Sequence, residues 1–357
     1  MNVEDIDHLE FYVEDVGQAA QQLCDGFGFV ICGEGGPRTG LADAHSLLLR
    51  QRGIAIVVTS ALSDSHPAAD YVRQHGDGLA VIAVRVADVL GAFAQAAARG
   101  GQTVVRPTFL GSGRGQVVLA SVLGFGDVTH RLVQRETMSG PFLPGVIDEV
   151  TDSVPDGLLD TVDHIAVCVP PGELIPTVHR YQTVFGFSET FEERILVGAQ
   201  AMDSKVVQNP LGTVTLTLLE PDTTRDPGQI DEFIASHGGA GVQHVAFRTG
   251  DITAAVAEIS ARGVPFLSTP PSYYDVLTDR LGELDVPVSA LRELSVLADR
   301  DRWGVMLQIF TRSRHPRRTL FYELIERRGA RSFGSNNIKA LYEAVERQRA
   351  AEQALRA

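Results

Sequence analysis

Two histidines and one glutamate stand out because each is an ionisable side chain inside an apolar stretch that reads as a β-strand. His164 lies in "VDHIAV", His244 in "VQHVAF" and Glu323 in "TLFYELIER". A carboxylate surrounded by aliphatic side chains must be paired, protonated or bound to a metal. Two imidazoles and one carboxylate, with other coordination positions left open, form the facial triad of non-haem Fe(II) oxygenases. These residue types therefore predict a metal centre.

The same residues also have a purely structural interpretation. A histidine in an apolar strand is often a hydrogen-bonded core residue, and Glu323 could instead pair with Arg327 or Arg328. A comparison within the chain helps to decide between the two interpretations, because the sequence repeats itself.

The stretches "HGDGLAVIAVRVAD" and "HGGAGVQHVAFRTGD" align, and so do "DHLEFYV" with "DHIAVCV" and "HRLVQR" with "YELIER". In this alignment Val81 stands opposite His244, and Arg131 stands opposite Glu323. Only His8 keeps the chemical type of its counterpart. A packing role alone would not change two of three positions together, so we interpret the first half as a structural twin without a complete site.

Each half divides again, because "VDHIAV" and "VQHVAF" also resemble each other. Every unit reads as a short strand, an amphipathic helix and further strands. The predicted fold class is α+β, with four βαβββ modules in two homologous domains and a C-terminal helix. The predicted boundaries are 1–137 for the N-terminal domain, 138–157 for a linker rich in Pro, Gly and acidic residues, and 158–357 for the catalytic domain.

Composition narrows the class of protein. The 357 residues carry a formal net charge of −14, which argues against nucleic acid or an anionic membrane as partner. The three cysteines form no CxxC pair, and no apolar stretch is long enough for a spanning helix or a signal peptide. The expectation is a cytoplasmic protein that acts on a small molecule, with a homo-oligomer left open.

The repeated units, with histidines on two first strands and a glutamate on a last strand, resemble the vicinal oxygen chelate superfamily. The strings "GGAGVQHVAF", "FLSTPPSYYD", "LADRDRWGVMLQIFT" and "FYELIERRGARSFGSNNIKALYEAVE" resemble the family of 4-hydroxyphenylpyruvate dioxygenase and 4-hydroxymandelate synthase. The resemblance covers essentially the whole chain and implies that the four modules form two homologous open-barrel domains, with the C-terminal helix over the active site. It implies Fe(II) bound by His164, His244 and Glu323, with 4-hydroxyphenylpyruvate and O₂ as substrates.

The resemblance also implies a set of substrate-contacting residues. These are Ser204, Thr217, Leu219, Gln229, Gln243, Gln308, Phe310, Phe333, Asn337, Ile338 and Tyr342. Gln308 and Phe310 alternate to one face of their strand, so both can face one pocket. Gln243 is the neighbour of His244 and should face away from it, unless a bulge turns it or it acts through the histidine.

Four positions depart from the dioxygenase pattern and resemble the synthase. Thr217 and Leu219 replace a proline and an asparagine, and Ile338 and Tyr342 replace two phenylalanines. An aliphatic side chain in place of an amide removes a hydrogen-bonding group and can reorient the substrate. The resemblance thus implies oxidative decarboxylation and benzylic hydroxylation to 4-hydroxymandelate, in hydroxyphenylglycine and peptide-antibiotic biosynthesis. The alternative is a dioxygenase that forms homogentisate in tyrosine catabolism.

Two further alternatives use the same architecture. One is a metal-free protein that sequesters a drug, against which the complete triad argues. The other is an extradiol ring-cleaving dioxygenase, whose catechol substrate would not explain the C-terminal sequence.

Overall fold

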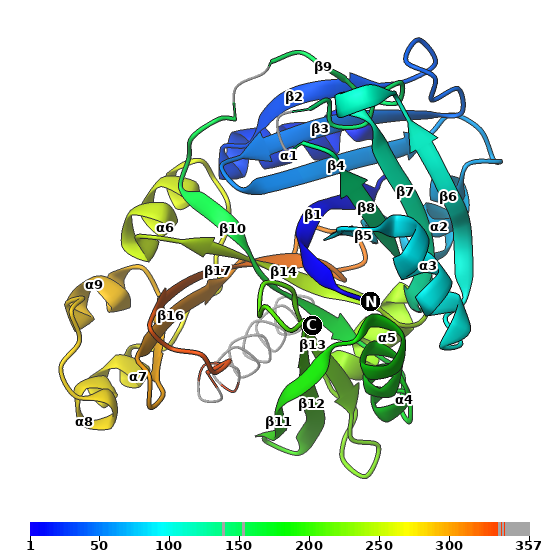
Figure 1. The fold of residues 1–357 in the computed structure, drawn as a ribbon. Helices are drawn as coiled ribbons and strands as arrows, with labels where there is room; N and C mark the ends of the chain where they lie inside the picture. The colour runs from blue at the N-terminus through cyan, green and yellow to red at the C-terminus, as the bar shows by residue number, and fades with distance from the viewer. Residues whose placement is uncertain (138–139, 152–153, 335–336, 338, 340–357) are drawn as a thin grey trace.

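The computed structural model describes residues 1–357 except 138–139, 152–153, 335–336, 338 and 340–357. Two twisted sheets with helices on their outer faces make up the molecule (Figure 1). The predicted α+β class and the curled, open sheets of the repeated modules are confirmed.

The first sheet has nine strands in the order β6-β7-β8-β5-β1-β4-β3-β2-β9. Its strands are β1 (Val3–Tyr12), β2 (Val30–Gly35), β3 (Ala44–Gln51), β4 (Ile54–Ala61), β5 (Gly78–Val86), β6 (Thr103–Leu110), β7 (Val117–Phe125), β8 (Val128–Arg135) and β9 (Asp148–Glu149). The helical segments are α1 (Val16–Phe27), α2 (Pro67–His75), α3 (Val89–Ala98) and the short η1 (Gly113–Gly115). The short β9 comes from the segment predicted as linker and pairs with β2.

The second sheet has eight strands in the order β11-β12-β13-β10-β14-β17-β16-β15. Its strands are β10 (Leu159–Cys168), β11 (Ser188–Val197), β12 (Gln200–Gln208), β13 (Thr215–Pro221), β14 (Gly241–Thr249), β15 (Leu297–Arg300), β16 (Val305–Phe310) and β17 (Phe321–Arg328). The helical segments are α4 (Leu174–Arg180), η2 (Tyr181–Phe185), α5 (Gln229–His237), α6 (Ile252–Ala261), α7 (Pro271–Asp275), α8 (Leu277–Leu281) and α9 (Val288–Glu293).

The strand pairing shows the repeat directly. In each sheet the first strands of two modules, β1 with β5 and β10 with β14, pair antiparallel at the centre. Each of these strands also pairs in parallel with the last strand of a module: β1 with β4, β5 with β8, β10 with β13, and β14 with β17. The central strands of the second sheet therefore bring residues from distant parts of the sequence to one place.

Helix α6 begins and ends as its sequence predicts. The Asp251 side chain accepts a hydrogen bond from the backbone N–H of Ala254, which caps the first turn. Just beyond the helix, Gly263 has φ of 85°, a left-handed conformation that favours glycine. Asp88 caps α3 in the same way, as expected for the equivalent helix of the first half.

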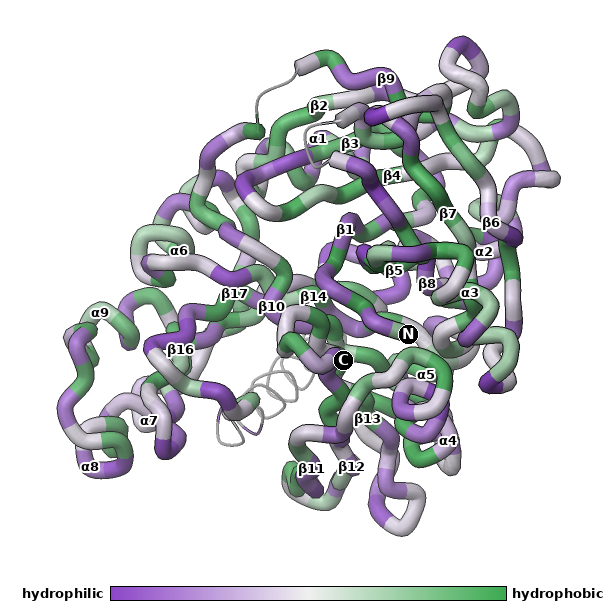
Figure 2. Tube along the Cα trace, viewed as in Figure 1, coloured by the Kyte–Doolittle hydropathy of each residue, from purple (hydrophilic) through white to green (hydrophobic). Residues whose placement is uncertain are grey.

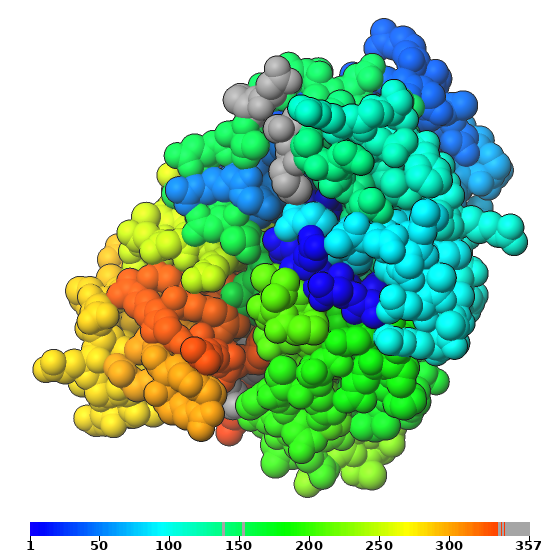
Figure 3. All heavy atoms as spheres, in the orientation of Figure 1, coloured from blue at the N-terminus to red at the C-terminus, as the bar shows by residue number. Residues whose placement is uncertain are grey.

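The two halves pack closely against each other (Figure 3), with β1 at the junction. An aromatic cluster joins them: Phe27 of α1 and Phe29 lie against Phe247 of β14 and Tyr322 of β17. Strands such as β1 and surface helices such as α8 both mix apolar and hydrophilic residues along the chain (Figure 2). Within the described part of the chain, no helix has the length and hydropathy needed to cross a membrane.

Candidate metal centre

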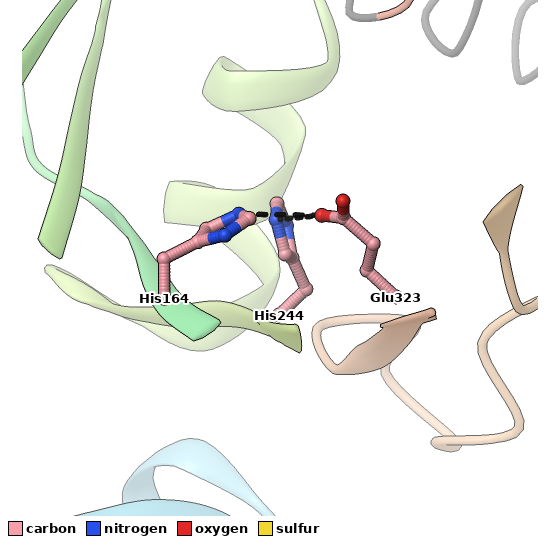
Figure 4. A group of neighbouring side chains, drawn as sticks. All are labelled: His164, His244 and Glu323. Atoms are coloured by element: carbon pink, nitrogen blue, oxygen red, sulfur yellow. Dashed lines mark ion pairs between the residues drawn. The ribbon is translucent and has the colours of Figure 1, made fainter. Parts of the chain in front are cut away.

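Three buried side chains converge in the second sheet: His164 from β10, His244 from β14 and Glu323 from β17 (Figure 4). The Nε2 atoms of His164 and His244 lie 3.2 and 3.3 Å from the same oxygen, Oε2 of Glu323. One ligand atom from each residue lies within 4.8 Å of the others. Two imidazole nitrogens and one carboxylate oxygen at this spacing could hold a divalent metal ion.

A register shift precedes each histidine and turns the preceding polar side chain toward its ring. The pairing of β10 with β14 skips Asp163 and Gln243. Asp163 Oδ1 lies 2.9 Å from His164 Nδ1, and Gln243 Oε1 lies 3.3 Å from His244 Nδ1. An acceptor at Nδ1 holds the ring proton there and leaves the Nε2 lone pair for a metal. Gln243 thus lies beside His244 because of a bulge, one of the two arrangements considered from the sequence.

The second oxygen of Glu323 is held by a chain of amides. Gln308 Nε2 donates to Glu323 Oε1 at 2.7 Å, and Asn337 Nδ2 donates to Gln308 Oε1 at 2.9 Å. The Tyr273 hydroxyl donates in turn to Asn337 Oδ1 at 3.0 Å. The carboxylate is therefore fixed with Oε1 on the amide and Oε2 toward the histidines.

The structural alternative for Glu323, an ion pair with a following arginine, is not what the fold shows. Arg327 makes two hydrogen bonds to Asp163, at 2.7 and 2.8 Å, and Arg328 pairs with Glu326 at 2.6 Å. Arg327 thus acts on His164 through Asp163.

Aromatic rings surround the two histidines. Phe333 meets the His164 ring edge-on with centroids 5.4 Å apart, and Phe321 stacks on the His244 ring at 4.8 Å. Phe310, predicted to share a strand face with Gln308, lies 6.0 Å from the His244 ring. The triad is therefore buried in largely apolar surroundings, which strengthen the electrostatic interactions among its three side chains.

The pKa values of the triad reflect this burial and the short contacts. Burial opposes ionisation of His164, but Glu323 and Asp163 outweigh it and raise the pKa of His164 to about 9. Burial also opposes ionisation of Glu323, yet the two histidines lower its pKa to about 2. For His244, burial dominates and lowers the pKa. The negative carboxylate thus requires a cation nearby, which is a proton on His164 in the absence of metal.

Three of the predicted substrate residues lie on the same sheet face as His164. Thr217 and Leu219 of β13 pair with residues two and four positions after His164, and Ser204 of β12 pairs with Leu219. All three are buried, and the Thr217 hydroxyl has no hydrogen-bond partner. A buried hydroxyl without a partner costs stability, so it is available to bind a polar group of a ligand.

The remaining predicted substrate residues differ in how far the structure describes them. Gln229 is buried at the start of α5, and Asn337 is fully buried against Gln308. Ile338 and Tyr342 lie outside the described residues, as does most of the predicted C-terminal helix.

The first sheet repeats the surroundings of His164 around His8. Asp7 Oδ1 lies 2.7 Å from His8 Nδ1, and Arg135 makes two hydrogen bonds of 2.8 Å to Asp7. The Phe142 ring lies edge-on to His8 at 5.0 Å and under the Arg135 guanidinium at 5.0 Å. In the second sheet Arg327 lies over Phe333 in the same way, at 5.3 Å.

The ligands themselves are replaced in the first sheet. Arg131 pairs opposite Ala83 just as Glu323 pairs opposite Ala246, which confirms the alignment of the two halves. The Nη1 atom of Arg131 lies 3.3 Å from His8 Nε2 and 2.6 Å from Glu10 Oε2. A guanidinium therefore supplies positive charge where the second sheet assembles its triad.

Sequence reasoning missed Asp163 and Arg327, although the signal was present. Both halves contain the pair Asp-His, and Arg135 aligns with Arg327 in "HRLVQR" and "YELIER". An aspartate and an arginine kept beside a repeated histidine indicate a shared orienting contact.

Comparisons with known proteins agree with this geometry. Residues 5–130 and 163–277 each match family models described as the glyoxalase/bleomycin resistance protein/dioxygenase superfamily. The 4-hydroxyphenylpyruvate dioxygenase of Xenopus tropicalis is 35% identical, over 95% of this chain and 90% of its own. That of Dictyostelium discoideum is 32% identical, over 97% and 98%.

Two solved structures are also similar to this chain. A mutant of 4-hydroxymandelate synthase from Streptomyces coelicolor superimposes with a TM-score of 0.90 and 45% identity, over 98% of this chain and all (100%) of that one. A Mn(II)-bound glyoxalase from Novosphingobium aromaticivorans has a TM-score of 0.52 at 11% identity, which reflects the fold alone.

Proposed function

Because the chain belongs to the family of 4-hydroxyphenylpyruvate dioxygenase and 4-hydroxymandelate synthase, we propose that it is an Fe(II)-dependent 4-hydroxymandelate synthase. The reaction converts 4-hydroxyphenylpyruvate and O₂ to 4-hydroxymandelate and CO₂. One oxygen atom enters the new carboxylate and the other the benzylic hydroxyl. Decarboxylation of the 2-oxo acid supplies two of the four electrons that reduce O₂, and oxidation of the benzylic C–H bond supplies the other two. We further propose a role in supplying hydroxyphenylglycine for peptide-antibiotic synthesis.

The donor set fits Fe(II). His164, His244 and Glu323 would hold the ion, and three protein ligands leave positions for a chelating 2-oxo acid and O₂. When bound, iron supplies O₂ activation coupled to decarboxylation. Asp163 and Gln243 accept at Nδ1, so that each Nε2 atom would be directed at the ion, and Gln308 keeps Oε2 of Glu323 directed at the same place.

The residues around the triad supply the rest of the site. Phe310, Phe321 and Phe333 exclude water and offer ring faces and edges to an aromatic substrate. Thr217 offers a buried hydroxyl without a partner, which can hydrogen-bond to the substrate. Substrate contact by the other predicted residues remains part of this proposal.

The observation that favours the synthase is the side chain of Leu219. It is buried among apolar residues of β10, β11 and α5, next to Ser204 and two positions from Thr217. At this position the dioxygenase pattern has an amide, which could hold the substrate so that its ring faces the reacting oxygen. An aliphatic side chain makes no such hydrogen bond, so the benzylic carbon can take that place.

Product analysis tests the proposal. The protein is loaded anaerobically with Fe(II), given 4-hydroxyphenylpyruvate and O₂, and the product is identified by proton NMR, because the two candidate products are isomers. A para-substituted ring with a benzylic CH–OH is expected. Homogentisate as the main product, recognised by its trisubstituted ring and CH₂ group, would show a dioxygenase instead.

The alternative is the dioxygenase of the curated relatives, and a paired substitution separates the two. Leu219→Asn with Ile338→Phe restores two residues of the dioxygenase pattern, and we expect a larger share of ring-attack product. Leu216→Met, on the opposite face of β13, is the matched control and should leave the product ratio unchanged. An unchanged ratio in the paired variant would show that these residues do not select the product.

A further inference from the structure

A cleft separate from the metal centre lies between the two halves of the molecule. It has a volume of about 790 Å³ and is lined by α1, the ends of β1 and α2, and the segment 311–322 that joins β16 to β17. Pockets that bind small molecules occupy roughly 300–1,000 Å³. None of the three triad residues lines the cleft.

One wall of the cleft is strongly cationic. Arg312, Arg314 and Arg317 line it, and His315 lies among them. Each guanidinium donates to a main-chain carbonyl oxygen, and in the part of the chain that the structure describes none of them makes an ion pair with a carboxylate. Carbonyl oxygens hold the arginines in place without cancelling their charge. Such a cluster is unusual in a chain with a net charge of −14 and favours an anionic ligand.

Carboxylates also line the cleft, and the fold already engages them. Asp15 caps α1 by accepting from the N–H of Gln18, and Asp77 accepts from the N–H of Glu14. Asp77 also lies beside His315. An anion is therefore attracted to the three arginines rather than to this histidine.

The floor of the cleft is partly aromatic. Tyr322 lines the cleft and is only half-buried although it lies where the two halves meet. Phe27 lies edge-on to Tyr322 with centroids 5.0 Å apart, and Leu23 adds an aliphatic side chain. The preceding residue, Phe321, points to the other face of the sheet and stacks on His244, so the cleft adjoins the metal centre.

We propose that this cleft is a second binding site, for a carboxylate that carries an aromatic ring. The carboxylate would pair with the arginine wall, and the ring would cover Tyr322. Both contacts are complementary to groups that the protein leaves uncovered. The site does not depend on the proposed function, because neither metal nor turnover takes part in the binding.

Calorimetric titration of the metal-free, full-length protein with phenylacetate tests the proposal. Phenylacetate lacks the 2-oxo group with which a substrate would chelate a metal. Arg314→Gln removes one charge from the wall, and Ala19→Trp fills the cleft from α1 without changing charge. Each is expected to weaken binding about ten-fold or more. Arg106→Gln, which removes an exposed arginine of β6 outside the cleft, is the control and should keep the affinity within about two-fold.

Circular dichroism of each variant checks that it is folded. Binding that survives both Arg314→Gln and Ala19→Trp would place the ligand elsewhere and overturn the proposal. Acetate binding as tightly as phenylacetate would also overturn it, since the ring would then contribute nothing.

Discussion

Single residues set the properties of the metal centre through their immediate neighbours. Burial alone would raise the pKa of Asp163, but hydrogen bonds from His164 and Arg327 lower it well below its usual range. Asp163 is thus a permanent anion that holds the Nδ1 proton of His164. Asp7 has the same partners in the first half, and the same forces lower its pKa.

The two aspartates allow a matched comparison. Asp163→Asn and Asp7→Asn each remove a buried charge from an Asp–His–Arg group, so each should lower the free energy of unfolding, on the order of 1–3 kcal/mol. Only Asp163 touches a predicted metal ligand. We expect Asp163→Asn to weaken Co(II) affinity about 10–100-fold and Asp7→Asn to leave it unchanged, measured by equilibrium titration. Equal affinities in the two variants would contradict the orienting role.

The unpartnered hydroxyl of Thr217 gives a second prediction at this scale. Thr217→Val removes a buried polar group with no partner, so the protein should be as stable or up to about 1 kcal/mol more stable in urea unfolding, while substrate binding weakens. Thr59→Val is the control, because the Thr59 hydroxyl donates to Glu10 and its loss should be destabilising. A clear loss of stability in Thr217→Val would show that its hydroxyl has a structural partner.

At the scale of secondary-structure elements, the bulged central strands decide how the site is assembled. Each bulge places two consecutive side chains on one side of the sheet, so that an acceptor accompanies a histidine. An unbulged β10 would direct Asp163 away from His164. β10 and β14 therefore each carry a predicted metal ligand together with the residue that orients it.

The sequence predicted the modules and the pairing of residues between them, because the repeats "DHLEFYV" and "DHIAVCV" can be aligned residue by residue. Asp251 and Gly263 are also residue types typical of the two ends of a helix, and they flank α6. The bulge at Gln243 could not be predicted, since a one-residue register shift leaves the apolar pattern almost unchanged. The contact of Gln308 with Glu323 could not be predicted either, because it depends on the register of β16 against β17.

An ion pair between a side chain of β1 and a side chain of β8 gives a prediction at this scale. Arg131 neutralises Glu10 inside the first sheet, with most of both side chains buried. Arg131→Met should cost about 3–5 kcal/mol of unfolding free energy, because it leaves a buried carboxylate without its cation. The double variant Glu10→Leu with Arg131→Met should recover most of that loss in denaturant unfolding. A loss equal to the sum of the two single variants would show that the pair is not coupled.

At the scale of the whole molecule, two histidines join the halves. His75 of α2 and His237 of α5 stack with centroids 4.2 Å apart, and the His75 ring approaches the backbone oxygen of His237 at 2.7 Å. The segment 311–322 completes the contact, because Arg317 donates to carbonyl oxygens at the end of α2. The junction thus has two stacked imidazole rings at its centre.

The contribution of this junction to the free energy of unfolding should decrease in acid. Burial, helped by the positive charges of His75, His315 and Arg317, lowers the pKa of His237 to about 4, while the Gly239 carbonyl acts in the opposite direction. Of the groups around it, Asp127 pairs with His75. Unfolded chains take up a proton at His237 near pH 6.5, and the folded protein does so only near pH 4. Its stabilising contribution is therefore complete above about pH 6.5 and lost as the pH falls to about 4.

Urea unfolding at several pH values measures this effect. His237→Phe should flatten the pH dependence of stability between about pH 6.5 and 4, by on the order of 1–3 kcal/mol. His45→Gln, which changes a partly exposed histidine of β3, should not. Identical pH profiles for the wild type and His237→Phe would exclude this histidine as the origin.

The guanidinium of Arg131 has a consequence for how each half of the protein depends on a bound ion. In the first half the guanidinium of Arg131 compensates the buried carboxylate of Glu10, so this half needs no added cation. In the second half a proton on His164 compensates the carboxylate of Glu323 until a cation binds. Without a bound ion the second half would therefore depend on the protonation of His164, whereas the first half would not depend on any ion.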